Sequence, residues 1–189
     1  MRFFCQLVLC GLVLVGCNSP IPLLNPSEVL ASKTPLVCPK ADIIEQASSY
    51  SDFLEGQVGD VNAMRYSISF SGLQGECSLD AEGNLKLDLF MLFLAQAGVG
   101  LEADTVTEAP WFLVVLHRNG DQWAVAARQK FVQKIAINRD SDSVAIREQF
   151  SITVPGLSES TIGEYSVVGG FLLNDGQWDF NENNPFYFR

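Results

Sequence analysis

The side chains that most often perform catalysis are sparse in this 189-residue sequence. His117 is the only histidine. A Ser-His-Asp triad on a G-x-S-x-G turn would need that motif in the chain, and the sequence does not contain it. His117 instead stands beside Asn119-Gly120, a pair typical of tight β-hairpins, where an exposed polar residue is ordinary. We therefore predict no catalytic residue and expect a protein that is not an enzyme.

Acidic and amide side chains near the C-terminus imitate the start of a calcium-binding loop. Asp179, Asn181 and Asn183 have the alternate spacing of its first ligands. Asn184 stands where the loop needs glycine, and no glutamate follows at the twelfth position. The chain also lacks a Walker A motif and a G-x-G-x-x-G fingerprint. We expect no metal and no cofactor.

The N-terminal segment has the features of a secretory signal peptide. Arg2 is followed by the apolar run Leu7–Val15, which is too short to span a bilayer as a helix. The next residues, Leu14-Val15-Gly16-Cys17, resemble the lipobox of bacterial lipoproteins. The resemblance implies that residues 1–16 are removed and that Cys17 carries a diacylglycerol and an amide-linked acyl chain. The lipid bilayer would then be the first partner of the protein.

The residues after Cys17 predict where and how the domain is held. Asn18 follows the lipidated cysteine, where an aspartate would retain an enteric-type lipoprotein at the inner membrane. The resemblance therefore implies a periplasmic domain in the cell envelope, with the outer membrane favoured over the inner one. We expect residues 17–36 to be an extended linker because it contains four prolines, Pro20, Pro22, Pro26 and Pro35.

Two of the five cysteines remain once the signal is removed and Cys17 is acylated. Cys38 and Cys77 form an even pair in an oxidising compartment, which predicts a disulfide. In the chain-entropy model, closing a loop of this length stabilises the fold by about 4 kcal/mol. Two cysteines and one histidine cannot complete a structural zinc site without carboxylate ligands.

The charge of the chain excludes one class of partner. The formal net charge is −10, from 12 cations and 22 acids. Nucleic-acid binding requires clustered lysine and arginine, so we expect no nucleic-acid partner. The same balance argues against a polybasic contact with anionic lipid.

The hydropathy pattern predicts a mainly β fold after one short helix. Residues Pro39–Tyr50 have a helical stripe of apolar side chains behind Pro39. Alternation then indicates strands within 64–70, 85–89 and 144–154, and a bulge is expected near Phe131 and Val132. Gly169-Gly170 inside a strand indicates a bulge or a close backbone approach.

Together these elements predict an antiparallel β-sandwich of about seven strands over residues 37–175, followed by a polar tail over 176–189. Tyr165 opens a late strand after a loop segment containing Leu157. That arrangement loosely resembles the tyrosine corner of immunoglobulin-like and fibronectin type III-like sandwiches. Their conserved pattern of a core tryptophan on a disulfide is absent.

Two strand segments, Phe90–Ala95 and Trp111–Leu116, are apolar on both faces. Either another layer covers their outer sides, or those sides bind a partner. The candidate interaction surface consists of Phe90, Leu92, Leu94, Phe112, Val114 and Leu116. We therefore expect a noncatalytic, membrane-anchored envelope lipoprotein that contacts another envelope protein. A module for a small or lipidic ligand and a cell-wall hydrolase using two carboxylates are the alternatives.

Overall fold

The structure is a computed structural model that describes residues 36–141, 143–155 and 161–184. The lipobox with Cys17, most of the proposed linker and Leu157 lie outside the described residues. One compact unit begins at Leu36 and contains all the elements discussed below.

The described chain contains eight strands, one α-helix and three single-turn 3-10 helices. The strands are β1 (Lys40–Ile43), β2 (Ser49–Phe53), β3 (Met64–Leu79), β4 (Leu85–Ala97), β5 (Thr105–Asn119), β6 (Gln122–Ile137), β7 (Val144–Val154) and β8 (Tyr165–Phe171). The helices are η1 (Glu45–Ala47), η2 (Val61–Ala63), η3 (Ile162–Glu164) and α2 (Asp175–Asn183).

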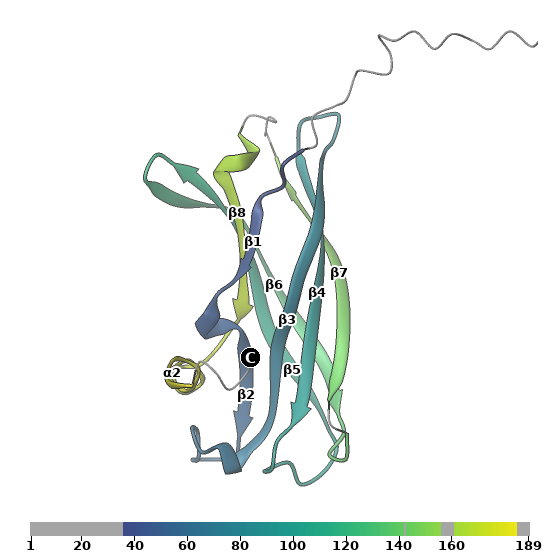
Figure 1. The fold of residues 1–189 in the computed structure, drawn as a ribbon, viewed down its shortest axis with the longest axis vertical. Helices are drawn as coiled ribbons and strands as arrows, with labels where there is room; N and C mark the ends of the chain where they lie inside the picture. Colours follow the sequence, from purple (N-terminus) through teal and green to yellow (C-terminus); the bar gives the residue numbers. More distant parts are fainter. Residues whose placement is uncertain (1–35, 142, 156–160, 185–189) are drawn as a thin grey trace, which may run out of the picture. The chain divides into compact units, whose positions relative to one another are not determined.

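The strands form two four-stranded sheets packed as a β-sandwich (Figure 1). The β5 sheet has the order β1-β8-β5-β6, and the β4 sheet has the order β2-β3-β4-β7. All pairs are antiparallel except β1 with β8. Strands β1 and β2 end the two sheets on one side, and β6 and β7 end them on the other. We call these sides the β1–β2 edge and the β6–β7 edge. The predicted fold class is confirmed.

The core lies between the sheets and is rich in aromatic rings. Phe70 stacks on Phe171 at 4.2 Å between ring centroids, and Trp111 stacks on Phe131 at the same distance. A hydrogen bond also joins the two sheets, since the hydroxyls of Tyr66 on β3 and Thr107 on β5 lie 2.6 Å apart. Burial raises the pKa of Tyr66, which keeps this hydroxyl neutral.

The short helix predicted within Pro39–Tyr50 is wrong. These residues form β1, the single turn η1 and the start of β2. β1 pairs with β8, and β2 pairs with β3. This pairing outweighs the helical stripe, because it satisfies the backbone N–H and C=O groups of both segments. The side chain of Ala47 in η1 fits against Gly170 of β8. A Cβ added at Gly170 would lie 2.7 Å from that of Ala47. The expected close approach at this glycine is therefore a packing contact.

Two details of the strands also differ from prediction. Strand β3 continues to Leu79, and its bulge falls between Phe70 and Gly72. Strand β6 pairs without a break through Phe131, whereas its register shift lies opposite Val115 and Leu116. Phe131 faces the core beside Trp111, and Gln133 is buried while Val132 is 61% exposed. The irregular alternation therefore comes from a polar residue at an inward position and an apolar residue at an outward position, not from a bulge.

The C-terminal segment expected as a polar tail contains α2, which packs against β2. Asn174 and Gln177 form a reciprocal capping box at its N-terminus. Phe180 packs edge-on against Phe53, with ring centroids 5.0 Å apart. Residues 175–183 are therefore an ordered part of the domain.

The predicted disulfide is confirmed. Cys38 and Cys77 are joined, with their Cα atoms 5.6 Å apart. Cys38 lies two residues before β1, and Cys77 lies near the end of β3. The bond thus fastens the start of the domain to the opposite sheet.

Candidate functional site

The six residues of the predicted interaction surface lie on two opposite faces of the sandwich. Phe90, Leu92 and Leu94 alternate with buried residues of β4 and point outward from the β4 sheet. The other three, Phe112, Val114 and Leu116, alternate with buried residues of β5 and point outward from the β5 sheet. The structure therefore separates them into two candidate surfaces.

The outer surface of the β5 sheet carries the more exposed apolar side chains of the two. Strand pairing places Val125 beside Leu116, and Trp123 beside Arg118, on this same surface. Trp123 is 54% exposed and Val125 is 61% exposed. We call this surface the β5–β6 face. It consists of Phe112, Val114, Leu116, Trp123, Val125, Arg118, Arg128 and Lys130.

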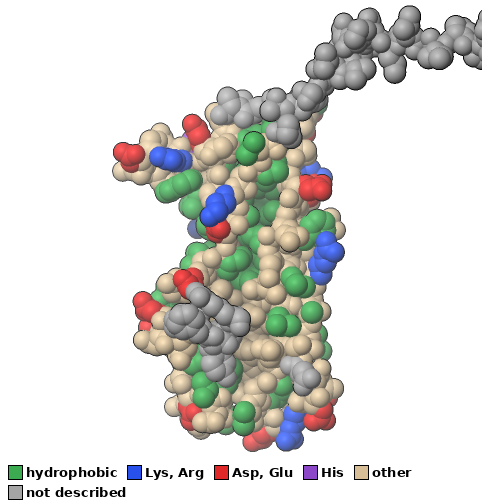
Figure 2. Space-filling view, viewed as in Figure 1, with side chains coloured by type: hydrophobic (Ala, Val, Ile, Leu, Met, Phe, Trp, Pro, Cys, Tyr) green, Lys and Arg blue, Asp and Glu red, His purple; other side chains and the backbone are tan. Residues whose placement is uncertain are grey.

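The end of the β5–β6 hairpin projects from the rest of the domain (Figure 1). All residues from 118 to 126 are exposed, and Gly120 adopts a φ of 63°, as a tight hairpin turn requires. Hydrophobic, basic and acidic side chains are all visible on this projection in Figure 2. The exposed side chain of Trp123 therefore gives the projecting hairpin a large apolar surface that is accessible for contact.

Basic residues lie along the β6 side and near the hairpin turn of the β5–β6 face. Arg128 pairs with Val114 in the strand register, and Lys130 pairs with Phe112. Neither forms a salt bridge with another described residue. The guanidinium of Arg118 donates to the carbonyl of Gly120 at 3.1 Å and pairs with no described carboxylate. This local excess of cations contrasts with the net charge of −10 for the whole chain.

The outer surface of the β4 sheet is less apolar. Leu92 is 38% exposed, and Phe90 and Leu94 are half-buried. A shallow hollow of about 300 Å³ lies beside Phe90 and Gly72, where β3 has its bulge. The guanidinium of Arg147 lies 4.4 Å from the centre of the Phe90 ring and so covers part of it. This surface is therefore partly shielded by its own side chains.

The titratable residues with shifted pKa values have structural partners. Burial raises the pKa of Asp52, and its ion pair with Arg65 opposes that shift. Hydrogen bonding to the Ser151 hydroxyl lowers the pKa of Asp88, which also pairs with Lys86. His117 lies 3.4 Å from a carboxylate oxygen of Glu164 at the domain surface. These are pairs that fasten neighbouring strands and turns.

Neither a metal-binding cluster nor a membrane-spanning helix is present among the described residues. No group of three or more histidine, cysteine, aspartate or glutamate side chains is placed to hold a metal ion. Asn181, from the calcium-like sequence, instead donates to the backbone carbonyls of Gln46 and Ser49. None of the described helices combines the length and the apolar composition needed to cross a membrane.

No protein-family model, curated protein or solved structure matches this chain.

Proposed function

We propose that this chain is a noncatalytic lipoprotein of the cell envelope whose domain binds another envelope protein through the β5–β6 face. The lipobox Leu14-Val15-Gly16-Cys17 supports the anchor, with acylated Cys17 in the bilayer and the domain in the periplasm, at the outer membrane in preference to the inner one. The disulfide between Cys38 and Cys77 suits an oxidising compartment.

The observation that carries the proposal is the composition of the β5–β6 face. It presents an exposed tryptophan and valine, three half-buried apolar side chains and unpaired cations on one continuous surface. Tryptophan and arginine are the residues most enriched at the centres of protein interfaces. The two-sheet sandwich also agrees with the loose resemblance to immunoglobulin-like and fibronectin type III-like domains, although that resemblance does not identify a partner.

The charge of this face specifies the chemistry of the partner. Arg118, Arg128 and Lys130 lack carboxylate partners within the described domain. We propose that the partner has a surface with an apolar centre and an acidic rim, which would pair with these cations and accelerate association. The rest of this acidic chain would repel such a partner, which would favour one orientation of binding.

The test is site-specific photo-crosslinking in intact cells, with the reactive residue placed at Val114 and, in a separate strain, at Leu94. Val114 lies on the β5–β6 face and Leu94 on the opposite outer surface. We expect one reproducible envelope protein from Val114 and none from Leu94. The double substitution Arg128→Glu and Lys130→Glu should abolish that crosslink, whereas Arg147→Glu on the β4 sheet should leave it unchanged.

Three results would contradict the proposal. The crosslink could form equally from both positions, it could form only from Leu94, or it could survive the charge reversal. Purified domain should also fail to bind vesicles containing one third phosphatidylglycerol. Vesicle binding that Arg128→Glu and Lys130→Glu abolish would assign the face to the membrane instead of a protein.

A further inference from the structure

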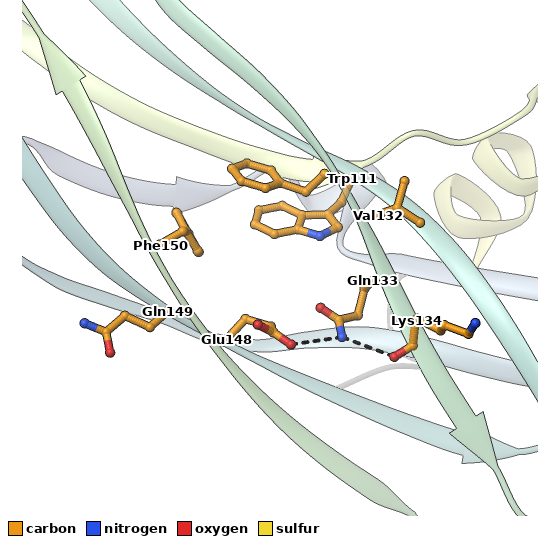
Figure 3. A pocket seen from close by; sticks show the side chains of 8 residues that line it. Trp111, Val132, Gln133, Lys134, Glu148, Gln149 and Phe150 are labelled. Atoms are coloured by element: carbon orange, nitrogen blue, oxygen red, sulfur yellow. Dashed lines mark hydrogen bonds between the residues drawn. The ribbon is translucent and has the colours of Figure 1, made fainter.

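The β6–β7 edge of the sandwich contains a cavity of about 350 Å³ that opens to solvent. Its walls come from Phe131 to Lys134 of β6, from Glu148 to Phe150 of β7, and from Trp111 of β5 at its inner end. Figure 3 shows these side chains around the space between the two strands. We call this cavity the edge slot. Its volume lies at the small end of the range of ligand pockets, about 300 to 1,000 Å³, and is enough for a small molecule.

The inner end of the edge slot presents a hydrogen-bond donor without an acceptor. Trp111 is 2% exposed, and its indole Nε1 is buried without a hydrogen-bond partner among the described residues. In Figure 3 the indole nitrogen lies on the side of the ring that faces Gln133 and Glu148. Indole N–H groups only donate, so this group needs an acceptor, and leaving it buried without one is costly.

A second buried group without a described partner gives a useful contrast. The hydroxyl of Ser51 is also buried and unpaired within the described residues. Ser51 lies on β2, where the side chain of Gln177 from α2 donates to its backbone carbonyl at 2.7 Å. Ser51 lines neither the edge slot nor the hollow beside Phe90, whereas Trp111 lines the edge slot.

Acceptors stand across the slot from this donor. The side-chain nitrogen of Gln133 donates to one carboxylate oxygen of Glu148 at 3.2 Å and also contacts the carbonyl of Lys134 at 3.3 Å. This arrangement fixes the amide of Gln133 and leaves the second oxygen of Glu148 able to accept. Gln133 is itself buried, so the polar groups of the slot are held in place by strand packing.

The apolar wall of the slot is aromatic. Phe150 lies edge-on to Trp111 at 5.4 Å between ring centroids and at 5.2 Å from Phe131. Phe131 and Phe150 are half-buried, so part of each ring is accessible from the slot. A ligand here therefore meets apolar ring surface on one side and hydrogen-bonding groups on the other.

We propose that the edge slot binds a neutral sugar unit. A hydroxyl group accepts a hydrogen bond from Trp111 Nε1 and donates one to Glu148, so it matches both polar groups of the slot. The C–H surface of a sugar ring packs against Phe131 and Phe150. A simple cation would suit the aromatic rings and Glu148 but would leave the indole N–H without an acceptor. This inference goes beyond the proposed protein contact, which uses the outer surface of the β5 sheet.

The experiment is an NMR titration of the folded, disulfide-bonded domain labelled with ¹⁵N. The probes are N-acetylglucosamine, glucose, tetramethylammonium and trialanine. We expect the indole N–H signal of Trp111 to shift and saturate with at least one of the two sugars. The indole signals of Trp123 and Trp178, both exposed, are internal controls and should stay in place.

Variants separate specific binding from a general effect. Glu148→Ala should weaken sugar binding at least tenfold, and the matched control Glu76→Ala, on the exposed surface of β3, should not change it. Trp111→Phe keeps an aromatic ring but removes the donor, and it should also weaken binding at least tenfold. If Trp111→Phe does not fold, Gln133→Ala provides the second test.

Four outcomes would overturn the proposal. These are no shift with either sugar, a shift that Glu148→Ala leaves unchanged, saturation by tetramethylammonium alone, and saturation by trialanine alone. The last two would assign the slot to a cation or to a peptide. If no probe shifts the indole N–H signal of Trp111, only water accepts a hydrogen bond from its Nε1.

Discussion

The two edges of the sandwich are closed in different ways. At the β1–β2 edge, the helix α2 lies over β2, and its side chains hydrogen-bond to the strand. Asn181 donates to the carbonyl of Ser49 at 2.9 Å, and Gln177 donates to that of Ser51 at 2.7 Å. At the β6–β7 edge, one side-chain hydrogen bond among the described residues, from Gln133 to Glu148, spans the gap.

The difference shows which edge supports the fold and which is available for binding. The outer strand of a sheet exposes unpaired backbone groups that attract other chains, and proteins often cover such an edge. Helix α2 serves this purpose for β2. The β6–β7 edge instead retains a cavity and a buried donor, Trp111 Nε1, without a described partner. Substitutions at the first edge should therefore reduce stability, whereas those at the second should affect binding more.

The largest expected effect concerns the disulfide at the β1–β2 edge. The double substitution Cys38→Ser and Cys77→Ser should lower the free energy of unfolding by about 4 kcal/mol, because it releases a loop of 39 residues in the unfolded chain. Urea denaturation followed by tryptophan fluorescence measures this change. A loss below about 1 kcal/mol would show that the unfolded chain is already restricted in this region.

The second effect compares the apolar contacts at the two edges. Phe180→Ala should destabilise the domain by about 3 kcal/mol, because it empties the contact of α2 with Phe53 and Met64. Phe150→Ala, at the half-buried β6–β7 edge, should cost about 1.5 kcal/mol. Thermal unfolding of the two variants gives the comparison. Equal losses would mean that both edges contribute similarly to stability.

The smallest effect compares the polar contacts. Asn181→Ala should cost about 2 kcal/mol, because the part-buried carbonyl of Gln46 and the buried carbonyl of Ser49 lose their donor. Gln133→Ala should cost about 1 kcal/mol. Amide hydrogen exchange should show faster exchange in β2 for the first variant only. Faster exchange in β2 for both variants would contradict the separation of the two edges.

Much of the sandwich could be predicted from the sequence because alternation of apolar residues determines strand faces. The buried residues of β4 and β7 follow this period of two, and Asn119-Gly120 marks the hairpin correctly. The pattern fails at Pro39–Tyr50, where a helical stripe is outweighed by pairing with distant strands. Local sequence does not reveal whether such partners are present.

The candidate sites were only partly predictable for the same reason. The alternation within 85–89 indicates that Phe90 points outward, but Trp111–Leu116 is apolar on both faces, and only the sheet order places Phe90 and Phe112 on opposite surfaces. The edge slot depends on β6 and β7 meeting at one edge, which the sequence does not specify. Helix α2 did have a local signal, because Asn174 and Gln177 have the spacing of a capping box.

The position of the disulfide has a mechanical consequence for any force applied at the N-terminal end of the domain. A pull on the backbone at Val37 reaches Cys38 and then passes across the sulfur bridge to Cys77 in β3. Strand β3 is paired with β4 from Tyr66 to Leu79, so the load enters one of the longest ladders of the domain. In the oxidised protein, the bridge gives this force a covalent path that bypasses β1. In the reduced protein, the same pull would peel the four residues of β1 from β8 before it strained anything else.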